Sequence, residues 1–223
     1  NGEFEALATG ATEDVTFTYT ATDNDGTVSG TQTVTITVTG TNDAPVASND
    51  AQGTDEETTL STSVPAATDV DGTVVSYALV DDTTKGNLTF NGDGTYSFDP
   101  NGEFEALATG ATEDVTFTYT ATDNDGTVSG TQTVTITVTG TNDAPVASND
   151  AQGTDEETTL STSVPAATDV DGTVVSYALV DDTTKGALTF NGDGTYSFDP
   201  NGEFEALAAG ATEDVTFTYT ATD

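Results

Sequence analysis

The stretch GTNDAPVASND occupies residues 40–50 and recurs unchanged at residues 140–150. Each time it follows a run of alternating Thr, Val and Ile, and a second β-rich region comes after it. It contains two Asn-Asp pairs, and Pro45 restricts the backbone between them. The stretch therefore predicts a short acidic joint between two β-structured domains.

The whole chain follows a period of 100 residues. Residues 1–123 overlay residues 101–223 with only two differences. The differing pairs are Asn87 and Ala187, and Thr109 and Ala209. The period is the size of one ordinary domain, and such near-identity suggests a window on a longer array of repeats.

The repeat frame predicts three parts. We expect the C-terminal part of a preceding repeat in residues 1–43, one complete repeat in 44–143, and a following repeat without its last strand in 144–223. A chain of this kind would carry its acidic joints at residues 40–50 and 140–150.

Composition excludes several functions. The net charge is −37, and the only cations are Lys85 and Lys185, so nucleic acid and anionic membranes would repel the chain. Without Cys or His there is no disulfide, no thiol nucleophile and no imidazole base. No apolar run approaches the ~20 residues of a membrane span, so direct membrane insertion is not expected. A divalent cation is the natural counter-charge.

The strand signal is strong throughout the repeat. Apolar residues alternate with Thr over residues 115–122 and 131–139, which is typical of half-buried antiparallel strands. The run at residues 74–80 offers Val75, Tyr77 and Leu79 on one face. Short strand runs flank the turn sequence NGDG at residues 91–94, and a further strand is expected at 58–63. About seven short strands per 100 residues predict an all-β fold of Ig-like antiparallel β-sandwiches. The expected core is Val75, Tyr77, Leu79, Leu88, Phe90, Tyr96, Phe98, Leu107, Val115, Phe117, Tyr119, Val134, Ile136 and Val138.

A helix is expected at one place at most. Residues 104–110, FEALATG, could form one or two turns that end at Gly110.

Acidic residues gather outside the strand alternation. Two D-x-D-G motifs hold Asp69 with Asp71, and Asp123 with Asp125. Alternate residues of an extended segment point the same way, so each motif aims two carboxylates at one point. Many hard oxygen ligands suit Ca²⁺ better than Mg²⁺, and the absence of His and Cys argues against zinc. One such motif alone indicates a solvated turn, but several acidic clusters per repeat with almost no cations favour bound calcium.

The motifs ATDVDG and ATDNDG, followed by VTITVTGTNDAPV, resemble the VCBS and cadherin-like repeats of giant bacterial RTX-type surface adhesins. The resemblance covers the whole chain. It implies a non-catalytic extender that holds an adhesive domain away from a Gram-negative cell, is extracellular, and is stiffened by Ca²⁺ at the joints. Its partners would be neighbouring repeats and, in a filament or biofilm matrix, other copies of the chain.

The resemblance also implies two groups of calcium ligands. The first joint would use Glu5 (or Glu3), Asn42, Asp43, Asp69, Asp71 and Asp123. The second would use Glu56, Glu57, Glu105, Asn142, Asp143, Asp169, Asp171 and Asp223. The linker is T-N-D-A-P, shorter in acidic ligands than the D-x-N-D-N run of cadherins, and the choice among Glu103, Glu105 and Glu113 stays open.

Four other readings stay open. The division of the chain into a partial repeat at each end would allow a self-assembling matrix filament. In it, one chain would donate a strand such as residues 31–39 to the next chain. A two-carboxylate glycosidase has no acidic pair that stands out, and no enzyme is expected. Thr rows such as Thr133, Thr135 and Thr137 could bind ice or sugar but are ordinary for a solvent-facing strand. Strong acidity also fits adaptation to high salt without specific ion sites.

Overall fold

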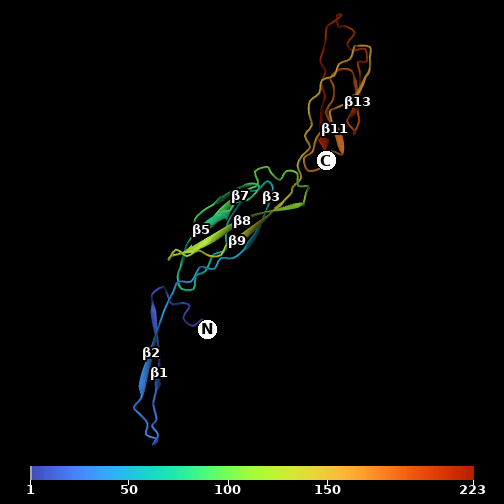
Figure 1. Ribbon diagram of the computed structural model, residues 1–223. Coiled ribbons are helices and arrows are strands. Elements are labelled where there is room, and N and C mark those ends of the chain that lie inside the picture. The colour runs from blue at the N-terminus through green and yellow to red at the C-terminus, as the bar shows by residue number, and fades with distance from the viewer. Residues whose placement is uncertain (1) are drawn as a thin grey trace. The chain divides into compact units, whose positions relative to one another are not determined.

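A computed structural model describes residues 2–223, and Asn1 lies outside the described residues. The described chain forms β-strands joined by turns, without an α-helix (Figure 1). The strands of the first 143 residues are β1 (Thr12–Tyr19), β2 (Gln32–Thr39), β3 (Asp50–Asp55), β4 (Leu60–Ser63), β5 (Val74–Asp81), β6 (Asn87–Phe90), β7 (Thr95–Asp99), β8 (Thr112–Asp123) and β9 (Gln132–Thr139). The remaining strands are β10 (Leu160–Ser163), β11 (Ser176–Asp181), β12 (Ala187–Phe190), β13 (Thr195–Asp199) and β14 (Thr218–Thr222).

Strands β3 to β9, within residues 44–143 that the sequence predicts as a complete repeat, form a sandwich of two antiparallel sheets. One sheet has the order β3-β9-β8-β5, and the other has the order β4-β7-β6. Strand β8 is the longest, and its side chains alternate between buried and solvent-facing positions. Apolar residues at every second position face the other sheet, while Thr faces water. The expected all-β sandwich is confirmed.

The core of this sandwich is aromatic. Phe117 of β8 packs edge-on against Tyr96 of β7, with ring centroids 4.9 Å apart, and against Phe90 of β6 at 5.8 Å. Such tilted contacts add to the stabilisation that burial of the rings supplies. Eight residues of the predicted core are buried: Tyr96, Phe98, Val115, Phe117, Tyr119, Val134, Ile136 and Val138.

The prediction that Val75 lies in the core is wrong. A β-bulge in β5 shifts the register between Val74 and Ser76, so Val75 is 60% exposed. A bulge places one residue outside the ladder and reverses the facing of the next. The sequence pattern of residues 74–80 does not reveal the bulge, because the pattern does not say which of the two alternating sets of residues faces the core.

The expected helical turns at residues 104–110 are also not formed. The segment consists of tight turns, with the Leu107 N–H donating to the Phe104 carbonyl at 2.8 Å. The Gly110 N–H then donates to the Gly140 carbonyl at 2.9 Å. A side chain at Gly140 would meet the Leu107 carbonyl oxygen at 2.4 Å, so the linker glycine allows this close approach.

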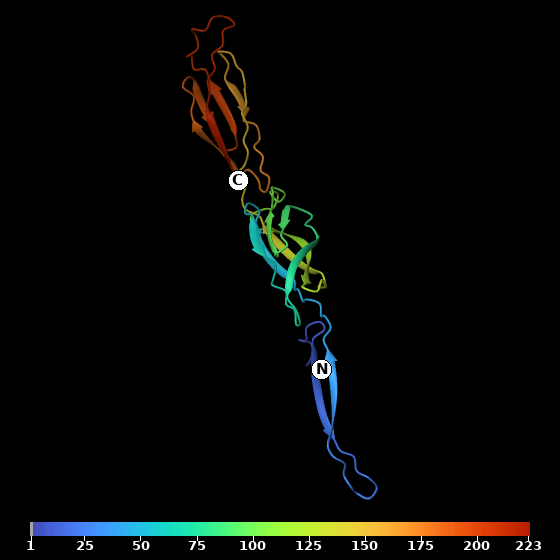
Figure 2. The ribbon, with the colours of Figure 1, turned by 90° about the vertical axis from the view of Figure 1, so that its left-hand side faces the viewer.

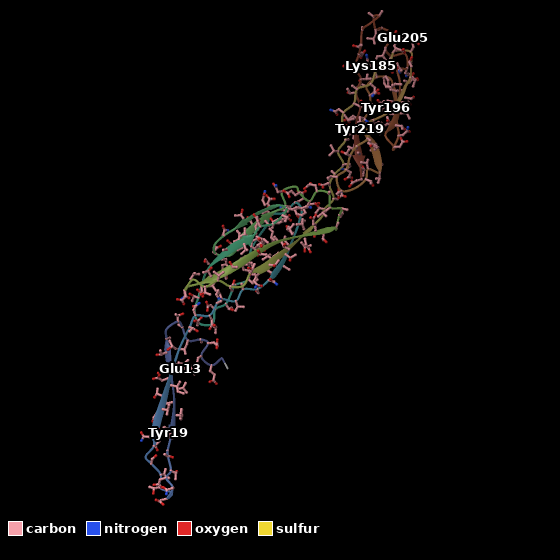
Figure 3. The ribbon with its side chains drawn as sticks, in the orientation of Figure 1. Glu13, Tyr19, Lys185, Tyr196, Glu205 and Tyr219 are labelled. Atoms are coloured by element: carbon pink, nitrogen blue, oxygen red, sulfur yellow. The ribbon has the colours of Figure 1, made fainter. Side chains whose placement is uncertain are left out.

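Residues 12–39 form the hairpin β1–β2, drawn in blue in Figures 1 and 2. Its register pairs Thr18 with Thr33 and Tyr19 with Gln32. The sequence equals that of β8 and β9, yet its aromatic residues are exposed: Phe17 is 52% exposed and Phe117 1%. Tyr19, labelled in Figure 3, is likewise half-exposed.

Residues 144–223 form two smaller sheets, with orders β10-β13-β12 and β11-β14. Residues 150–155 repeat the sequence of β3 letter for letter but form no strand. In the complete repeat β3 pairs with β9, so this first strand forms where the last strand is present.

By their contacts the residues fall into two compact units, which are described separately. One comprises Asn1–Glu103 and Glu113–Val138, and the other comprises Phe104–Thr112 and Thr139–Asp223. None of the described residues belongs to a helix long and apolar enough to cross a membrane.

Candidate metal centres

The first acidic turn, Asp69 to Gly72, is built by its own carboxylate. Asp69 Oδ1 accepts the N–H groups of Asp71 at 3.2 Å and Gly72 at 3.0 Å. A Cβ at Gly72 would meet the side-chain oxygen of Asn124 at 2.6 Å and Asp69 Oδ2 at 3.3 Å. A side chain at this position would therefore displace the Asn124 side chain, because the turn packs against the end of β8.

Asn124 clamps that turn to the end of β8. Its Oδ1 accepts the Thr73 N–H at 2.7 Å, and its own N–H donates to the Thr73 carbonyl at 3.0 Å. The two D-x-D-G motifs, about 50 residues apart in sequence, are thereby held side by side at one pole of the sandwich.

The linker residues attach to this pole directly. The Asp43 N–H donates to Asp71 Oδ1 at 3.2 Å. Asn42 Nδ2 donates to Asp123 Oδ2 at 2.8 Å and to the Thr127 hydroxyl oxygen at 2.8 Å. Five predicted ligands of the first joint, Asn42, Asp43, Asp69, Asp71 and Asp123, therefore form one connected group.

Asp123 is the anchor of this group and is only 1% exposed. Its Oδ1 accepts the Asp125 N–H at 2.9 Å and the Thr127 N–H at 2.7 Å. The bond from Asn42, followed by these backbone donors, holds the pKa of Asp123 below its usual value. The carboxylate is thus ionised and already well satisfied by N–H donors.

Asp69 and Asp71 are different, because each keeps one buried carboxylate oxygen without a donor. Both Oδ2 atoms lie out of solvent and accept no hydrogen bond. Burial raises the pKa of Asp71 above its usual value, and the nearby charges of Asp69 and Asp43 raise it further. Unpaired buried carboxylate oxygens are costly, and an oxygen-only donor set is what Ca²⁺ prefers. The residues present therefore fit a calcium ion.

The second joint repeats this arrangement. Asn142 Nδ2 donates to Asp223 Oδ2 at 2.6 Å, and the Asp143 N–H donates to Asp171 Oδ1 at 3.3 Å. Asp169 Oδ1 again accepts the Asp171 N–H, at 3.3 Å. The Oδ2 atoms of Asp143 and Asp169 are buried without a donor. The second unit thus brings Asn142, Asp143, Asp169, Asp171 and Asp223 together.

The sequence model of the bacterial cadherin-like domain family matches the chain twice, at residues 42–140 and at residues 142–223. The chain belongs to this family. The two matched stretches begin at the linker residues Asn42 and Asn142. No curated protein matches the chain.

Solved structures similar to this bacterial cadherin-like chain include animal cadherins. A protocadherin gammaB7 EC3-6 cis-dimer structure is 16% identical with TM-score 0.45, over 93% of this chain and 54% of the other. Protocadherin gamma B2 domains 3-6 are 16% identical with TM-score 0.43, over 98% and 56%. Drosophila N-cadherin EC1-4 is 16% identical with TM-score 0.36, over 98% and 60%. The chain spans little more than half the length of these proteins.

Several predicted ligands of this bacterial cadherin-like chain stay predictions. Glu5 is exposed, as is Glu3. Glu56 is buried and Glu57 exposed, both just after β3, while Glu105 lies in the other unit. Within the first unit, Glu113 forms an ion pair with Lys85 at 2.6 Å and Glu103 accepts the Gly86 N–H at 3.1 Å.

Three residues that complete the first cadherin-like joint were not predicted as site residues. Asn124 and Thr127 lie in or next to the ATDNDG motif. Asn124 accepts the Thr73 N–H, directly after the Asp69–Gly72 turn, and Thr127 accepts a hydrogen bond from Asn42. Thr9 donates its hydroxyl to Asp125 Oδ2 at 3.2 Å, which joins the preceding segment to the same pole. The Asn in D-N-D-G is the sequence signal that could have indicated the clamp, whereas nothing in the sequence marks Thr9.

Proposed function

We propose that this chain is a non-catalytic extender of a secreted bacterial adhesin or surface fibre, with calcium bound at its joints. Domains of its family are extracellular, generally non-enzymatic and typically bind calcium. The resemblance to VCBS repeats of RTX-type adhesins further supports a place on the surface of a Gram-negative cell. The near-identical repeats suit a spacer, whose task is length rather than a unique active site.

One observation carries the calcium part of the proposal. At both joints, buried carboxylate oxygens without a donor lie beside the linker: those of Asp69 and Asp71 at the first, and of Asp143 and Asp169 at the second. Two carboxylates ~4 Å apart repel by about 4 kcal/mol at an effective dielectric constant of 20. A bound cation would supply the missing positive charge.

Neutralisation of these carboxylates would stiffen the joint, because residues of the linker are hydrogen-bonded to the same acidic group. Asp43 is tied to Asp71 through its backbone, and Asn42 is tied to Asp123 through its side chain. With the repulsion between Asp43, Asp69 and Asp71 removed, these bonds would hold the linker against the pole of the domain. Weak extracellular sites of this kind bind at about millimolar calcium.

Small-angle scattering with parallel thermal melts, in calcium and in EDTA at matched ionic strength, tests the proposal. We expect a longer, stiffer and more stable particle in calcium. The double variant Asp71→Asn and Asp171→Asn should lose this response. The matched control, Asp82→Asn with Asp182→Asn, makes the same charge change at exposed turn residues and should keep it. Equal dimensions and stability with and without calcium would count against calcium-locked joints.

A further inference from the structure

Thr9 lies in a tight turn that is fastened to the start of the linker. The Ala11 N–H closes the turn by donating to the Ala8 carbonyl at 2.8 Å. The Gly10 N–H donates to the Gly40 carbonyl at 3.0 Å, and the Gly40 N–H donates back to the Ala11 carbonyl at 2.8 Å. The backbone therefore holds Thr9 beside the linker before its side chain makes any contact.

The Thr9 hydroxyl meets two other segments at once. It donates to Asp125 Oδ2 at 3.2 Å, and it lies 3.5 Å from Asn42 Oδ1 in the linker. A hydroxyl has one hydrogen, and the shorter contact to a charged acceptor takes it. Asn42 in turn donates to Asp123 Oδ2. The hydroxyl therefore lies where the segment before β1, the linker and the pole of the sandwich come together, all within one compact unit.

The same turn and the same linker contact recur in the second unit. The Gly110 N–H donates to the Gly140 carbonyl at 2.9 Å, and the Thr109 hydroxyl lies 3.5 Å from Asn142 Oδ1. The placement of this threonine beside the linker is therefore built into the repeat.

The position of this threonine is one of only two at which the overlaid copies of the repeat differ. It is occupied in turn by Thr9, Thr109 and Ala209, and alanine has no hydroxyl to donate. The other difference begins at Asn87, which is merely exposed on the edge strand β6. The change from Thr to Ala thus falls on a contact at the joint, which the sequence alone does not reveal.

We propose that this threonine is a positioning residue that sets the stiffness of the joint independently of calcium. Where it is present, as at Thr9, its hydroxyl holds the segment before β1 against Asp125. Where alanine replaces it, this restraint is lost and the joint swings more freely. An array of such repeats would then combine stiffer and looser joints by changing one residue and no calcium ligand. The proposal rests on the extender role of the proposed function but not on its calcium part.

The size of the effect follows from the exposure of the contact. Thr9 and Asp125 are both exposed, so water competes for the bond. A net hydrogen bond of this kind changes the ratio of joints with the bond to joints without it roughly two- to tenfold. Because Thr9 lies outside the sandwich, the change affects how widely the segments move and not whether the sandwich folds.

A distance measurement between two spin labels tests the proposal, because the chain has no cysteine of its own to interfere with labelling. The labels are attached through Thr35→Cys on β2 and Ser61→Cys on β4, which are exposed positions of the same unit. Pulsed electron paramagnetic resonance in EDTA gives the distribution of distances between the labels. We expect Thr9→Ala to broaden this distribution, whereas Thr9→Ser, which keeps the hydroxyl, should leave it as narrow as in the parent.

A double-mutant cycle assigns the effect to the bond with Asp125. Asp125→Ala should broaden the distribution as much as Thr9→Ala does, and the two substitutions together should add nothing further. Asn87→Ala, the other natural difference between the copies, is the matched control and should leave the distribution unchanged. A thermal melt of Thr9→Ala should have the same midpoint as that of the parent, because the sandwich is untouched.

An unchanged distribution in Thr9→Ala would overturn the proposal, because the hydroxyl would then not restrain the joint. Equal broadening by Thr9→Ser would also overturn it, since the effect would belong to packing of the side chain. Additive effects of Thr9→Ala and Asp125→Ala would show that the two residues do not act through one bond. Repeating the measurement in calcium separates this test from the proposed function. If calcium leaves the parent distribution unchanged, calcium-locked joints are contradicted while the role of Thr9 stands.

Discussion

Gly72 allows the first acidic turn to pack closely against the side chain of Asn124. An added Cβ would meet the Asn124 side-chain oxygen at 2.6 Å, and that oxygen accepts the N–H and hydroxyl of Thr73. We expect Gly72→Ala to destabilise the complete repeat by roughly 1–3 kcal/mol and to weaken its calcium response. Urea melts with and without calcium measure both effects.

Gly92 provides the control for this substitution. Nothing lies within 4 Å of a Cβ built there. Gly92→Ala should therefore leave both stability and the calcium response nearly unchanged. Equal effects of the two substitutions would show that the turn at Gly72 is not packed as described.

Asp93 gives a pH dependence that does not involve the joints. Its Oδ1 accepts the Thr95 hydroxyl at 2.6 Å and the Thr95 N–H at 3.0 Å, and these bonds hold the pKa of Asp93 below its usual value. A depressed pKa in the folded state stabilises the fold above the unfolded pKa, about 3.9, and this stability is lost as pH falls through the folded pKa.

The prediction concerns the variant Asp93→Asn with Asp193→Asn, because Asp193 makes the same bonds in the second repeat. The variant should be less stable than the parent at pH 6, and the difference should shrink steadily below pH ~4. Denaturant melts at several pH values, in EDTA, measure it. A difference that stays constant down to pH 2 would contradict the assignment.

At the level of elements, β9 orders β3. The two strands are neighbours in the sheet, and the same sequence at residues 150–155 forms no strand. We expect Ile136→Ala, at a fully buried position of β9, to cost roughly 2–5 kcal/mol and to raise hydrogen exchange of the β3 amides. Ile36→Ala in the exposed hairpin is the matched control and should cost less than ~0.5 kcal/mol in dilute solution.

The strands show where sequence reasoning succeeds and where it stops. The period-2 alternation predicted β9 to within one residue and most of β8, which begins three residues earlier at Thr112, because one face of each strand is buried. It did not predict β3, whose sequence DAQGTD is polar and becomes a strand through its neighbour. It placed Val75 on the wrong face, because a bulge changes the facing without changing the pattern.

The candidate site was predictable only where its signal lies in the local sequence. Residue type and spacing indicated Asp69, Asp71 and Asp123, and the resemblance to adhesin repeats implied Asn42 and Asp43. The Asn124 clamp depends on a contact between segments 51 residues apart, with Thr73 as its partner. Local sequence spacing carries no information about such a contact.

At the scale of the whole molecule, the question is whether the net charge of −37 acts only as a diffuse negative surface or includes specific ion-binding sites. A diffuse negative surface responds to any salt, because screening weakens the repulsion between carboxylates over a Debye length of ~10 Å at 0.1 M. NaCl alone should therefore raise the melting temperature gradually. Sites add a second response that saturates and depends on the ion.

We expect calcium to raise the melting temperature beyond NaCl at equal ionic strength. Magnesium should raise it less, because Asp69 and Asp71 offer only oxygen ligands, whereas Mg²⁺ demands a near-ideal octahedron and dehydrates reluctantly. At calcium a hundredfold above the dissociation constant, each site adds about 2.7 kcal/mol. Asp69→Asn with Asp169→Asn should remove the calcium increment and keep the NaCl response. Identical curves for the three salts would mean that the carboxylates, including their buried oxygens, are neutralised only by screening.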